Sequence, residues 1–288
     1  MRALVFGTTG QVARELARHL PDGVQLTALS RADADLSDPG ACAEAVTGAQ
    51  ADVVINAAAY TAVDRAENEE TLATVINGAA PGAMARAAAA RGLPFVHLST
   101  DYVFDGSGSA PFTPEDETGP LNAYGRSKLA GEREIVEAGG RHVILRTSWV
   151  FSAHGANFVK TMLRLAEARD RLDIVSDQRG GPTPAGEIAA AVWRIAGQLH
   201  SGGGASGIHH FSGWPDTGWD GFAREIFDKA GKNVTVKGIP TAAYPTPARR
   251  PLNSRLDCST TEATFGIERP DWRRALSDIL HHPRKDDI

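Results

Sequence analysis

Over the first 150 residues, short apolar runs alternate with alanine-rich stretches of helical periodicity. This alternation is typical of β-α-β units, in which crossover helices join parallel strands. The strands are apolar along nearly their whole length, which suits a sheet covered by helices on both faces. The pattern therefore predicts an α/β fold with a doubly wound, Rossmann-type parallel sheet. The predicted strands are Ala3–Phe6, Gln25–Leu29, Val53–Asn56, Phe95–Ser99 and Val143–Leu145, and the predicted helices are Val12–His19, Thr71–Ala90 and Ala123–Glu137.

The chain after residue 150 is less regular. Helical periodicity predicts helices at Phe158–Ala168, Glu187–Gln198 and Phe222–Lys229. Ser201–Ser206 is predicted to be a surface loop, and the proline-rich Tyr244–Pro251 an irregular segment that covers a ligand. We therefore expect residues 1–150 to form the parallel-sheet body. Residues 151–288 are expected to form a smaller part over the strand ends, with some segments returning to the body.

A glycine-rich turn, Gly7-Thr8-Thr9-Gly10-Gln11-Val12-Ala13, links the first predicted strand to the first predicted helix. Gly7 permits a tight turn, and Gly10 lets the backbone approach a pyrophosphate that sits against the helix N-terminus. Such turns are common, but the position between a strand and a helix favours a dinucleotide site. Residues 1–150 are thus predicted to be an NAD(P)-binding domain, with Gly7, Gly10, Gln11 and Val12 as cofactor contacts.

The second predicted strand is followed by Ser30 and Arg31. A carboxylate here would bind the ribose 2′-hydroxyl of NAD, whereas a hydroxyl and a guanidinium suit the 2′-phosphate of NADP. The sequence therefore favours NADPH, with NADH as an alternative. Asp35 and Leu36 are predicted to border the adenine, and Ala58 to lie beside the cofactor at the end of the third strand.

The overall charge argues against partners that need a basic surface. The formal net charge is -5, and the pI is near 6.0. This excludes the charge pattern expected for binding nucleic acid or anionic lipid. Two cysteines, Cys42 and Cys258, are too few for a disulfide framework or a multi-thiolate metal site. The apolar N-terminal run is too short for a signal peptide, and no segment is long enough to span a bilayer, so a cytoplasmic protein with no membrane partner is expected.

Tyr124 and Lys128 are spaced to lie on one face of a predicted helix. A free phenol has a pKa near 10, and a nearby ammonium favours the phenolate. The pair is therefore expected to act as an acid–base pair in which Lys128 lowers the pKa of Tyr124. Thr100 and Asp101 follow the fourth predicted strand, and ligands of a parallel sheet bind at the carboxyl ends of its strands. Thr100 is thus expected to hydrogen-bond a substrate oxygen beside the phenol.

These stretches resemble the extended short-chain dehydrogenase/reductase superfamily and, within it, the dTDP-4-dehydrorhamnose reductase family. The resemblance spans nearly the whole chain. It is carried by GTTGQV at the start, NAAAYTAVDRAE from Asn56, STDYVFDG from Ser99, PLNAYGRSKLAGE from Pro120, RTSWVF from Arg146, DQRGGPT from Asp177 and ARRPLNSRLDC from Ala248.

The resemblance implies NADPH-dependent reduction of the C4 keto group of dTDP-4-dehydro-β-L-rhamnose to dTDP-L-rhamnose. It implies that Tyr124 donates the proton, that Lys128 is its partner, and that Thr100 tunes Tyr124 and touches the sugar. It further implies cofactor contacts at Ala59, Tyr60 and Thr61 and substrate contacts at Asp101 and Trp149. A packed aromatic after a core strand is the alternative for Trp149.

The diphosphate of a nucleotide sugar requires cationic donors. Arg249, Arg250 and Arg255 flank a turn in the C-terminal part, and Arg250 is the predicted substrate contact, with a surface role as the alternative.

The sequence shows no metal-ligand spacing. His97 lies between Val96 and Leu98 and is predicted to be a core histidine. Some relatives bind Mg²⁺ between subunits, and Glu15 and Glu187 are the nearest acidic candidates here. Mg²⁺ is therefore an expectation from resemblance alone, and the same holds for a homodimer.

The sequence bears on four alternative functions. A sugar 4,6-dehydratase needs an Asp–Glu pair after the strand-end threonine, but Tyr102 follows Asp101 here. A 4-epimerase, or a reductase of another dTDP-linked 4-keto-deoxysugar, uses the same tyrosine and lysine and stays open. A non-catalytic protein resembling the regulatory subunit of methionine adenosyltransferase also stays open.

Overall fold

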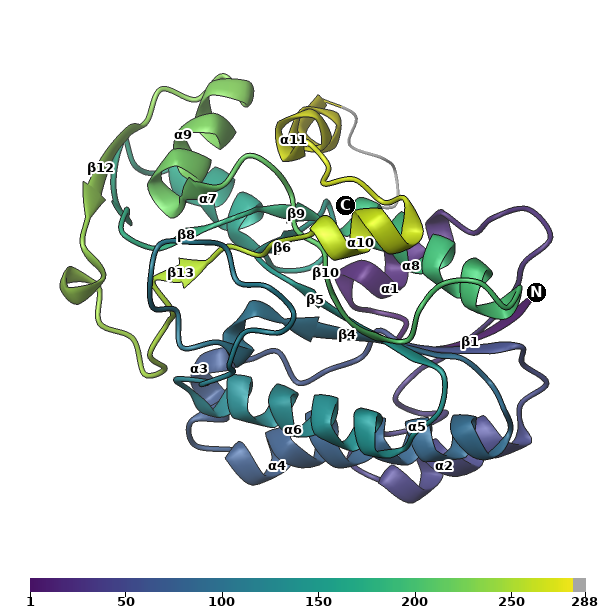
Figure 1. The fold of residues 1–288 in the computed structure, drawn as a ribbon. Helices are drawn as coiled ribbons and strands as arrows, with labels where there is room; N and C mark the ends of the chain where they lie inside the picture. The colour runs from purple at the N-terminus through teal and green to yellow at the C-terminus, as the bar shows by residue number, and fades with distance from the viewer. Residues whose placement is uncertain (282–288) are drawn as a thin grey trace.

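A six-stranded parallel sheet forms the centre of the computed structural model, which describes residues 1–281 (Figure 1). The strand order is β10-β5-β4-β3-β1-β2, and every neighbouring pair is parallel. The strands are β1 (Arg2–Phe6), β2 (Gln25–Leu29), β3 (Val53–Asn56), β4 (Phe95–Thr100), β5 (His142–Thr147) and β10 (Gly207–His210). The five predicted strands are confirmed, with β1, β4 and β5 longer than predicted by one to three residues.

Helices cover both faces of the sheet, as the apolar strands predict (Figure 1). On one face α2 (Pro39–Gly48), α5 (Ala80–Ala90) and α6 (Ala123–Glu137) pack over a core that includes Met84 and Ile135. On the other, α1 (Gln11–Arg18) packs against α8 (Ala185–His200). The doubly wound α/β prediction is therefore confirmed.

The long predicted helix Thr71–Ala90 is wrong as a single element. It is divided into α4 (Glu70–Thr74), a π-helical turn η1 (Val75–Ala79) and α5. The wider turn holds the Asn77 side chain, which accepts a hydrogen bond from Tyr60 N at 2.8 Å and donates to Ser127 Oγ at 2.9 Å. α6 passes so close to this turn that a Cβ at Gly131 would collide with the Asn77 carbonyl oxygen. The π turn therefore joins the loop after β3 to α6.

A second, smaller core lies beside the carboxyl ends of the sheet, at the upper left of Figure 1. It packs around Phe151, Phe222 and Trp272. The elements around it are α7 (Phe158–Ala166), β7 (Arg171–Val175), α9 (Trp219–Lys229), β12 (Thr235–Ile239) and α11 (Trp272–His281). Short strands connect this part to the body: β6 (Val150–Phe151), β8 (Arg179–Gly180), β9 (Thr183–Pro184), β11 (Thr217–Gly218) and β13 (Asn253–Ser254). The remaining elements are α3 (Val63–Ala66), η2 (Asp101–Val103), η3 (Thr241–Ala243) and α10 (Ser259–Phe265).

Two segments of the second half belong to the sheet body. β10 pairs with β5 at the sheet edge, and Ile188 and Val192 of α8 pack with Leu16 of α1. Of the predicted second part, residues 282–288 lie outside the described residues. Among the helices of residues 1–281, none combines the length and the apolar character that crossing a membrane requires.

Candidate active site

The carboxyl ends of β1, β3 and β4 lie at one edge of the sheet. β2 and β3 flank β1 on opposite sides, and the helices that follow β1 and β3 cover opposite faces. In open parallel sheets this reversal leaves a crevice at the strand ends where ligands bind. The Gly7 turn, Ala58 and Thr100 all follow strands at this edge.

The glycine turn has the conformation that a phosphate loop needs. Gly7 has φ +111°, which only glycine adopts readily, and a Cβ there would lie 3.4 Å from Ala57. Gly10 is the N-cap of α1 and gives no side-chain hydrogen bond, so the first N–H groups of the helix stay available to an anion. Gln11 is held by Ser152 Oγ and Asn157 Nδ2, which donate to its Oε1 at 2.9 and 3.0 Å.

Arg31 is an exposed member of the predicted cofactor contacts. Its side chain is 78% exposed and lies 3.4 Å from the Asp35 carboxylate. Ser30 N and Oγ both donate to Asp33 Oδ2, at 2.8 and 2.7 Å, which fixes the turn after β2. The guanidinium is thus free to swing toward a phosphate at little cost, because exposed ion pairs contribute little stability.

Hydrogen bonds from two side chains fix the loop after β3. Ala58 N donates to Asn56 Oδ1 at 3.1 Å. The Tyr60 phenol donates to Glu69 at 2.6 Å, and the raised pKa of Tyr60 follows from that hydrogen bond. Ala59 and Thr61 are exposed at this edge. The loop therefore presents small side chains and backbone to the crevice.

Thr100 and Tyr124 meet at the end of β4. The Thr100 hydroxyl lies close enough to the Tyr124 phenol to lower its pKa, and Tyr102 N donates to Thr100 Oγ1 at 3.2 Å. Tyr124 is in the first turn of α6, whose N-cap Asn122 accepts from Gly125 N at 2.8 Å. The structure thus brings together the strand-end hydroxyl and the phenol that the sequence predicts.

The prediction that Lys128 acidifies Tyr124 is wrong for this structure. Burial raises the pKa of Tyr124 to about 12; the neighbouring Thr100 hydroxyl opposes this shift, and the Asp101 charge adds to it. Lys128 Nζ instead contacts His97 Nε2 at 2.9 Å and donates to the Leu98 carbonyl oxygen at 2.7 Å. Burial lowers the pKa of Lys128 to about 8, with the Glu132 carboxylate opposing the shift. A phenol with a raised pKa keeps its proton at neutral pH.

His97 is more than the core histidine that the sequence predicts. It is fully buried, and burial next to Lys128 holds its pKa well below the usual value, so the ring is neutral. Asn56 lies opposite it in the sheet register, and Asn56 Nδ2 contacts His97 Nδ1 at 3.1 Å. Contacts through Asn56 and His97 therefore link the loop after β3 to Lys128.

Strand alternation would have revealed this contact. His97 and Ser99 share one face of β4, and Lys128 and Glu132 share one face of α6. Ser99 Oγ donates to Glu132 at 2.5 Å, parallel to the contact between His97 and Lys128. Two side chains that are two residues apart on β4 therefore contact two side chains that are four residues apart on α6.

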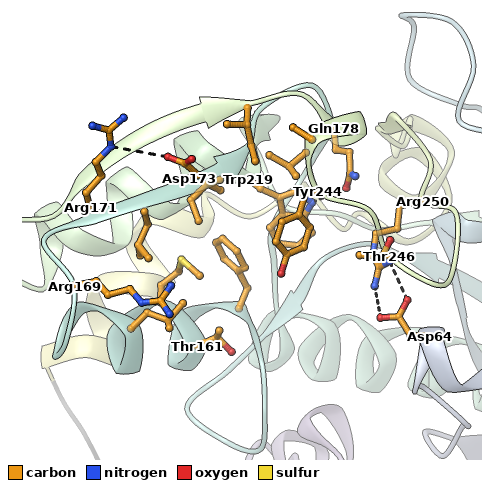
Figure 2. Close-up of a pocket in the computed structure, with 18 of the residues that line it drawn as sticks. Asp64, Thr161, Arg169, Arg171, Asp173, Gln178, Trp219, Tyr244, Thr246 and Arg250 are labelled. Atoms are coloured by element: carbon orange, nitrogen blue, oxygen red, sulfur yellow. Dashed lines mark hydrogen bonds and ion pairs between the residues drawn. The ribbon is translucent and has the colours of Figure 1, made fainter.

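A pocket of about 940 Å³ lies among Trp219, Tyr244 and Arg250 (Figure 2). Tyr102 lines it, and the ring centroids of Tyr102 and Tyr124 are 5.7 Å apart. Arg169, Arg171 and Asp173 lie at one end, and the ion pair between Asp64 and Arg250 lies at the other (Figure 2). Tyr244 and Thr246 come from the predicted covering segment and line the pocket as well. The pocket volume matches that of small-molecule sites.

Trp149 and Arg250 support this pocket. Trp149 is half-buried, has φ 48°, and stacks on the pocket-lining Trp219 with 3.6 Å between ring centroids. Arg250 makes a bidentate pair with Asp64, with N–O distances of 3.0 and 2.8 Å. Three residues that line the pocket were not predicted from the sequence, because no motif spacing links them: Asp64, Tyr102 and Trp219.

The two acidic residues considered for Mg²⁺ do not form a ligand set. Glu15 is buried and lies 3.0 Å from Arg18 and 3.2 Å from His154, while Glu187 is exposed in the first turn of α8. Within residues 1–281, no group of three or more His, Cys, Asp or Glu side chains is arranged to hold a metal ion.

The whole chain is similar to known proteins. Residues 1–284 match the family model described as the RmlD substrate binding domain. A dTDP-4-dehydrorhamnose reductase of Sinorhizobium fredii is 46% identical over 97% of both chains. A crystal structure of a dTDP-4-dehydrorhamnose reductase from Clostridium acetobutylicum has a TM-score of 0.92 at 35% identity, covering 98% of this chain and 99% of that one. The same enzyme from Bacillus anthracis, solved in complex with NADP, has a TM-score of 0.91 at 30% identity, covering 97% and 98%.

Proposed function

The chain belongs to the RmlD substrate-binding-domain family, and on that basis we propose that it reduces the C4 keto group of dTDP-4-dehydro-β-L-rhamnose with NADPH, which gives dTDP-L-rhamnose. The observation that supports this most is the position of Thr100 and Tyr124. Thr100 ends β4, Tyr124 lies in the first turn of α6, and the ring of Tyr124 neighbours Tyr102, which lines the pocket.

The chain has the parts that a nicotinamide dinucleotide needs. The turn at Gly7 leaves room where a Cβ would meet Ala57, and the uncapped start of α1 suits a pyrophosphate. When bound, the reduced cofactor supplies the hydride. Arg31 is proposed to bind the 2′-phosphate, since its guanidinium is accessible and its present partner is exposed.

The protein's own groups handle the proton. Tyr124 donates it to the oxygen that becomes an alkoxide, and its raised pKa keeps the phenol protonated until then. Thr100 lies beside the phenol, lowers its pKa, and stabilises the negative charge as it develops. His97 and the Leu98 carbonyl oxygen hold Lys128 Nζ in place. From this position Lys128 orients the ribose of the cofactor.

The pocket suits the nucleotide end of the substrate. Aromatic walls from Trp219 and Tyr244 offer faces on which a pyrimidine can stack. Arginines at the pocket ends offer cationic donors to the diphosphate. Asp101 and Trp149 are proposed to border the sugar, because Asp101 follows Thr100 and Trp149 stacks on Trp219.

Arg250→Ala is expected to raise the KM for the nucleotide sugar about tenfold and to leave the KM for NADPH within about twofold, since the lost charge faces the pocket. Initial rates with each substrate varied in turn measure both constants. Asp64→Asn tests whether the fixed position of Arg250 matters in addition to its charge, because this variant weakens the ion pair that holds Arg250 but keeps the arginine itself. Equal increases in the two KM values for Arg250→Ala would argue against the assignment.

Arg31→Ala is expected to raise the KM for NADPH about tenfold, or ~1.4 kcal/mol, while the KM for NADH changes little. The reason is that only NADPH carries the 2′-phosphate that the guanidinium would bind. Arg133→Ala serves as the control, because Arg133 is also an exposed arginine but lies on α6. A parallel rise in both constants would show that Arg31 acts on the fold of the loop.

The proposed reaction is tested by following loss of NADPH absorbance with enzymatically made dTDP-4-dehydrorhamnose. Stoichiometric oxidation with formation of dTDP-L-rhamnose supports the reductase. An epimerase would convert substrate without net oxidation of NADPH, and a regulatory subunit would do neither. Turnover only with a different dTDP-linked 4-keto sugar would keep the chemistry and change the substrate.

A further inference from the structure

We propose that His97 is a positioning residue that holds Lys128 as an uncharged amine. The imidazole donates a hydrogen bond that only the uncharged form of the lysine can accept. This inference deepens the reductase function proposed above and rests on it, because Lys128 lies one helical turn after the proton donor Tyr124. Four contacts of buried groups lead to it, and the first of them fixes the direction of the others.

The Asn56 side chain can be oriented in only one way. A backbone N–H can only donate, and Ala58 N lies 3.1 Å from Asn56 Oδ1. Turning the amide over would place its NH2 group against this N–H, so that two donors would face each other. Asn56 Nδ2 therefore faces His97 Nδ1, at 3.1 Å. Because both side chains are fully buried, a mismatch of hydrogens between them would be costly.

This orientation selects the tautomer of His97. Asn56 Nδ2 carries only donor hydrogens, so His97 Nδ1 must be the acceptor. The same contact excludes the doubly protonated ring, which would donate at both nitrogens, and burial holds the pKa of His97 well below its usual value. A neutral ring that accepts at Nδ1 carries its hydrogen at Nε2. That hydrogen faces Lys128 Nζ, 2.9 Å from Nε2.

Lys128 can accept this hydrogen only as a free amine. An ammonium has three hydrogens and no lone pair, whereas an amine has two hydrogens and one lone pair. The lone pair accepts from His97 Nε2, and one hydrogen goes to the Leu98 carbonyl oxygen at 2.7 Å. The second hydrogen is left for a ribose hydroxyl of the cofactor. The amine therefore matches both protein contacts, whereas an ammonium would set one of its own hydrogens against the Nε2–H.

The charges around Lys128 permit the amine. Burial lowers the pKa of Lys128 to about 8, and the Glu132 carboxylate opposes this shift. Glu132 is itself paired with Arg146 at 2.6 Å, which weakens its pull on the lysine. A hydrogen bond that only the neutral form can make lowers the pKa of a base further. Among the described residues, the buried charged or imidazole side chains on α6 and the elements packed against it are His97, Asp101, Lys128, Glu132 and Arg146.

An uncharged Lys128 accounts for the state of the phenol. Without its charge, the lysine does not pull the pKa of Tyr124 down, and burial raises that pKa to about 12. The phenol thus keeps the proton that it must donate when the keto group is reduced. His97 therefore acts on the reaction through Lys128.

Nitrogen NMR of the cofactor-free wild type, labelled with 15N, tests both assignments without turnover. We expect His97 to carry its hydrogen at Nε2, and Lys128 to titrate below about pH 8. His97→Gln and Lys128→Met identify the two signals by their loss. A hydrogen on His97 Nδ1, or a Lys128 ammonium that persists above about pH 8, overturns the proposal. Failure of the reductase function is a separate result, since it would show as wild type without NADPH oxidation.

His97→Gln tests the positioning role, because its amide can turn an oxygen toward Lys128 and accept from an ammonium. We expect Lys128 to titrate at least about one pH unit higher, a tenfold change in its protonation constant. The charged lysine then favours the phenolate, so kcat is expected to begin falling at a lower pH than in the wild type. The KM for the nucleotide sugar is expected to change less than about threefold.

His209→Gln is the matched control, since His209 is also a buried histidine but lies on β10. It is expected to leave the titration of Lys128 and the pH profile of kcat unchanged. A loss of kcat in His97→Gln without a change in the Lys128 titration overturns the positioning role, because it would show a structural effect alone. The wild-type tautomer decides the proposal independently of whether His97→Gln folds.

Discussion

Tyr124→Phe is expected to lower kcat by about 10²- to 10⁴-fold, or roughly 3–5 kcal/mol in the activation barrier. The variant loses only the phenolic oxygen, which is the atom that donates the proton in the proposed reaction and whose pKa the neighbouring Thr100 hydroxyl lowers. The ring stays packed against Tyr102, so the fold and the cofactor site should be retained. NADP affinity, measured by fluorescence titration, is therefore expected to change less than about twofold.

Tyr102→Phe provides the comparison for that result. Its phenol is a neighbour of Tyr124 and lines the same pocket. Of the groups of Tyr102, it is the backbone N–H and not the phenol that hydrogen-bonds the Thr100 hydroxyl. We expect a loss of kcat of less than about tenfold, less than one acid–base group contributes. Equal losses in the two variants, or near-normal turnover of Tyr124→Phe, would contradict the role of Tyr124 as the proton donor.

Glu132→Ala is expected to lower the free energy of unfolding by about 3–5 kcal/mol. Glu132 and Arg146 are each 2% exposed, and their closest N–O distance is 2.6 Å. Removing the carboxylate leaves the Arg146 guanidinium buried without a counter-charge, with the face of Phe104 at 4.9 Å and only long contacts to Pro114 O at 3.4 Å and His210 Nε2 at 3.5 Å. Denaturant unfolding followed by circular dichroism measures the change.

Glu134→Ala is the matched control on the same helix. Glu134 pairs with Arg86 at 2.6 Å, but the two side chains are 40% and 55% exposed. Exposed pairs contribute about 0–1 kcal/mol, so the control should stay close to the wild type. The double variant Glu132→Leu/Arg146→Met should recover most of the lost stability, because no unpaired buried charge remains. Similar losses for Glu132→Ala and Glu134→Ala would refute the argument from burial.

The sequence predicts the body of the fold well, for a physical reason. The strands of a covered parallel sheet are apolar on both faces, so short runs such as Val53–Asn56 stand out against the alanine-rich helices. The helix Ala123–Glu137 is predicted with its observed bounds because its periodicity is a local signal. The glycine turn and the strand-end Thr100 are likewise identified by their position after a strand.

The features that were not predicted depend on contacts between distant segments. The π turn at Val75–Ala79 has no local signal in the sequence. It goes with the hydrogen bonds that the Asn77 side chain makes to Tyr60 and Ser127, which are distant in the chain. The pair between Asp64 and Arg250 joins residues 186 positions apart. The pKa of Tyr124 was predicted in the wrong direction because helical spacing gives the distance of a charge along the helix, but not the extent of burial.

The return of α8 and β10 to the sheet body has a consequence for biosynthesis of the chain. Until residue 210 has left the ribosome, β5 remains an open edge, and the apolar side chains of α1 have no α8 to cover them. At a synthesis rate of about 5–20 residues per second, the nascent first half waits roughly several seconds in this state. An exposed parallel edge is a template for aggregation. Chaperone binding to stalled chains should therefore be strongest before β10 emerges and weaken once it has paired.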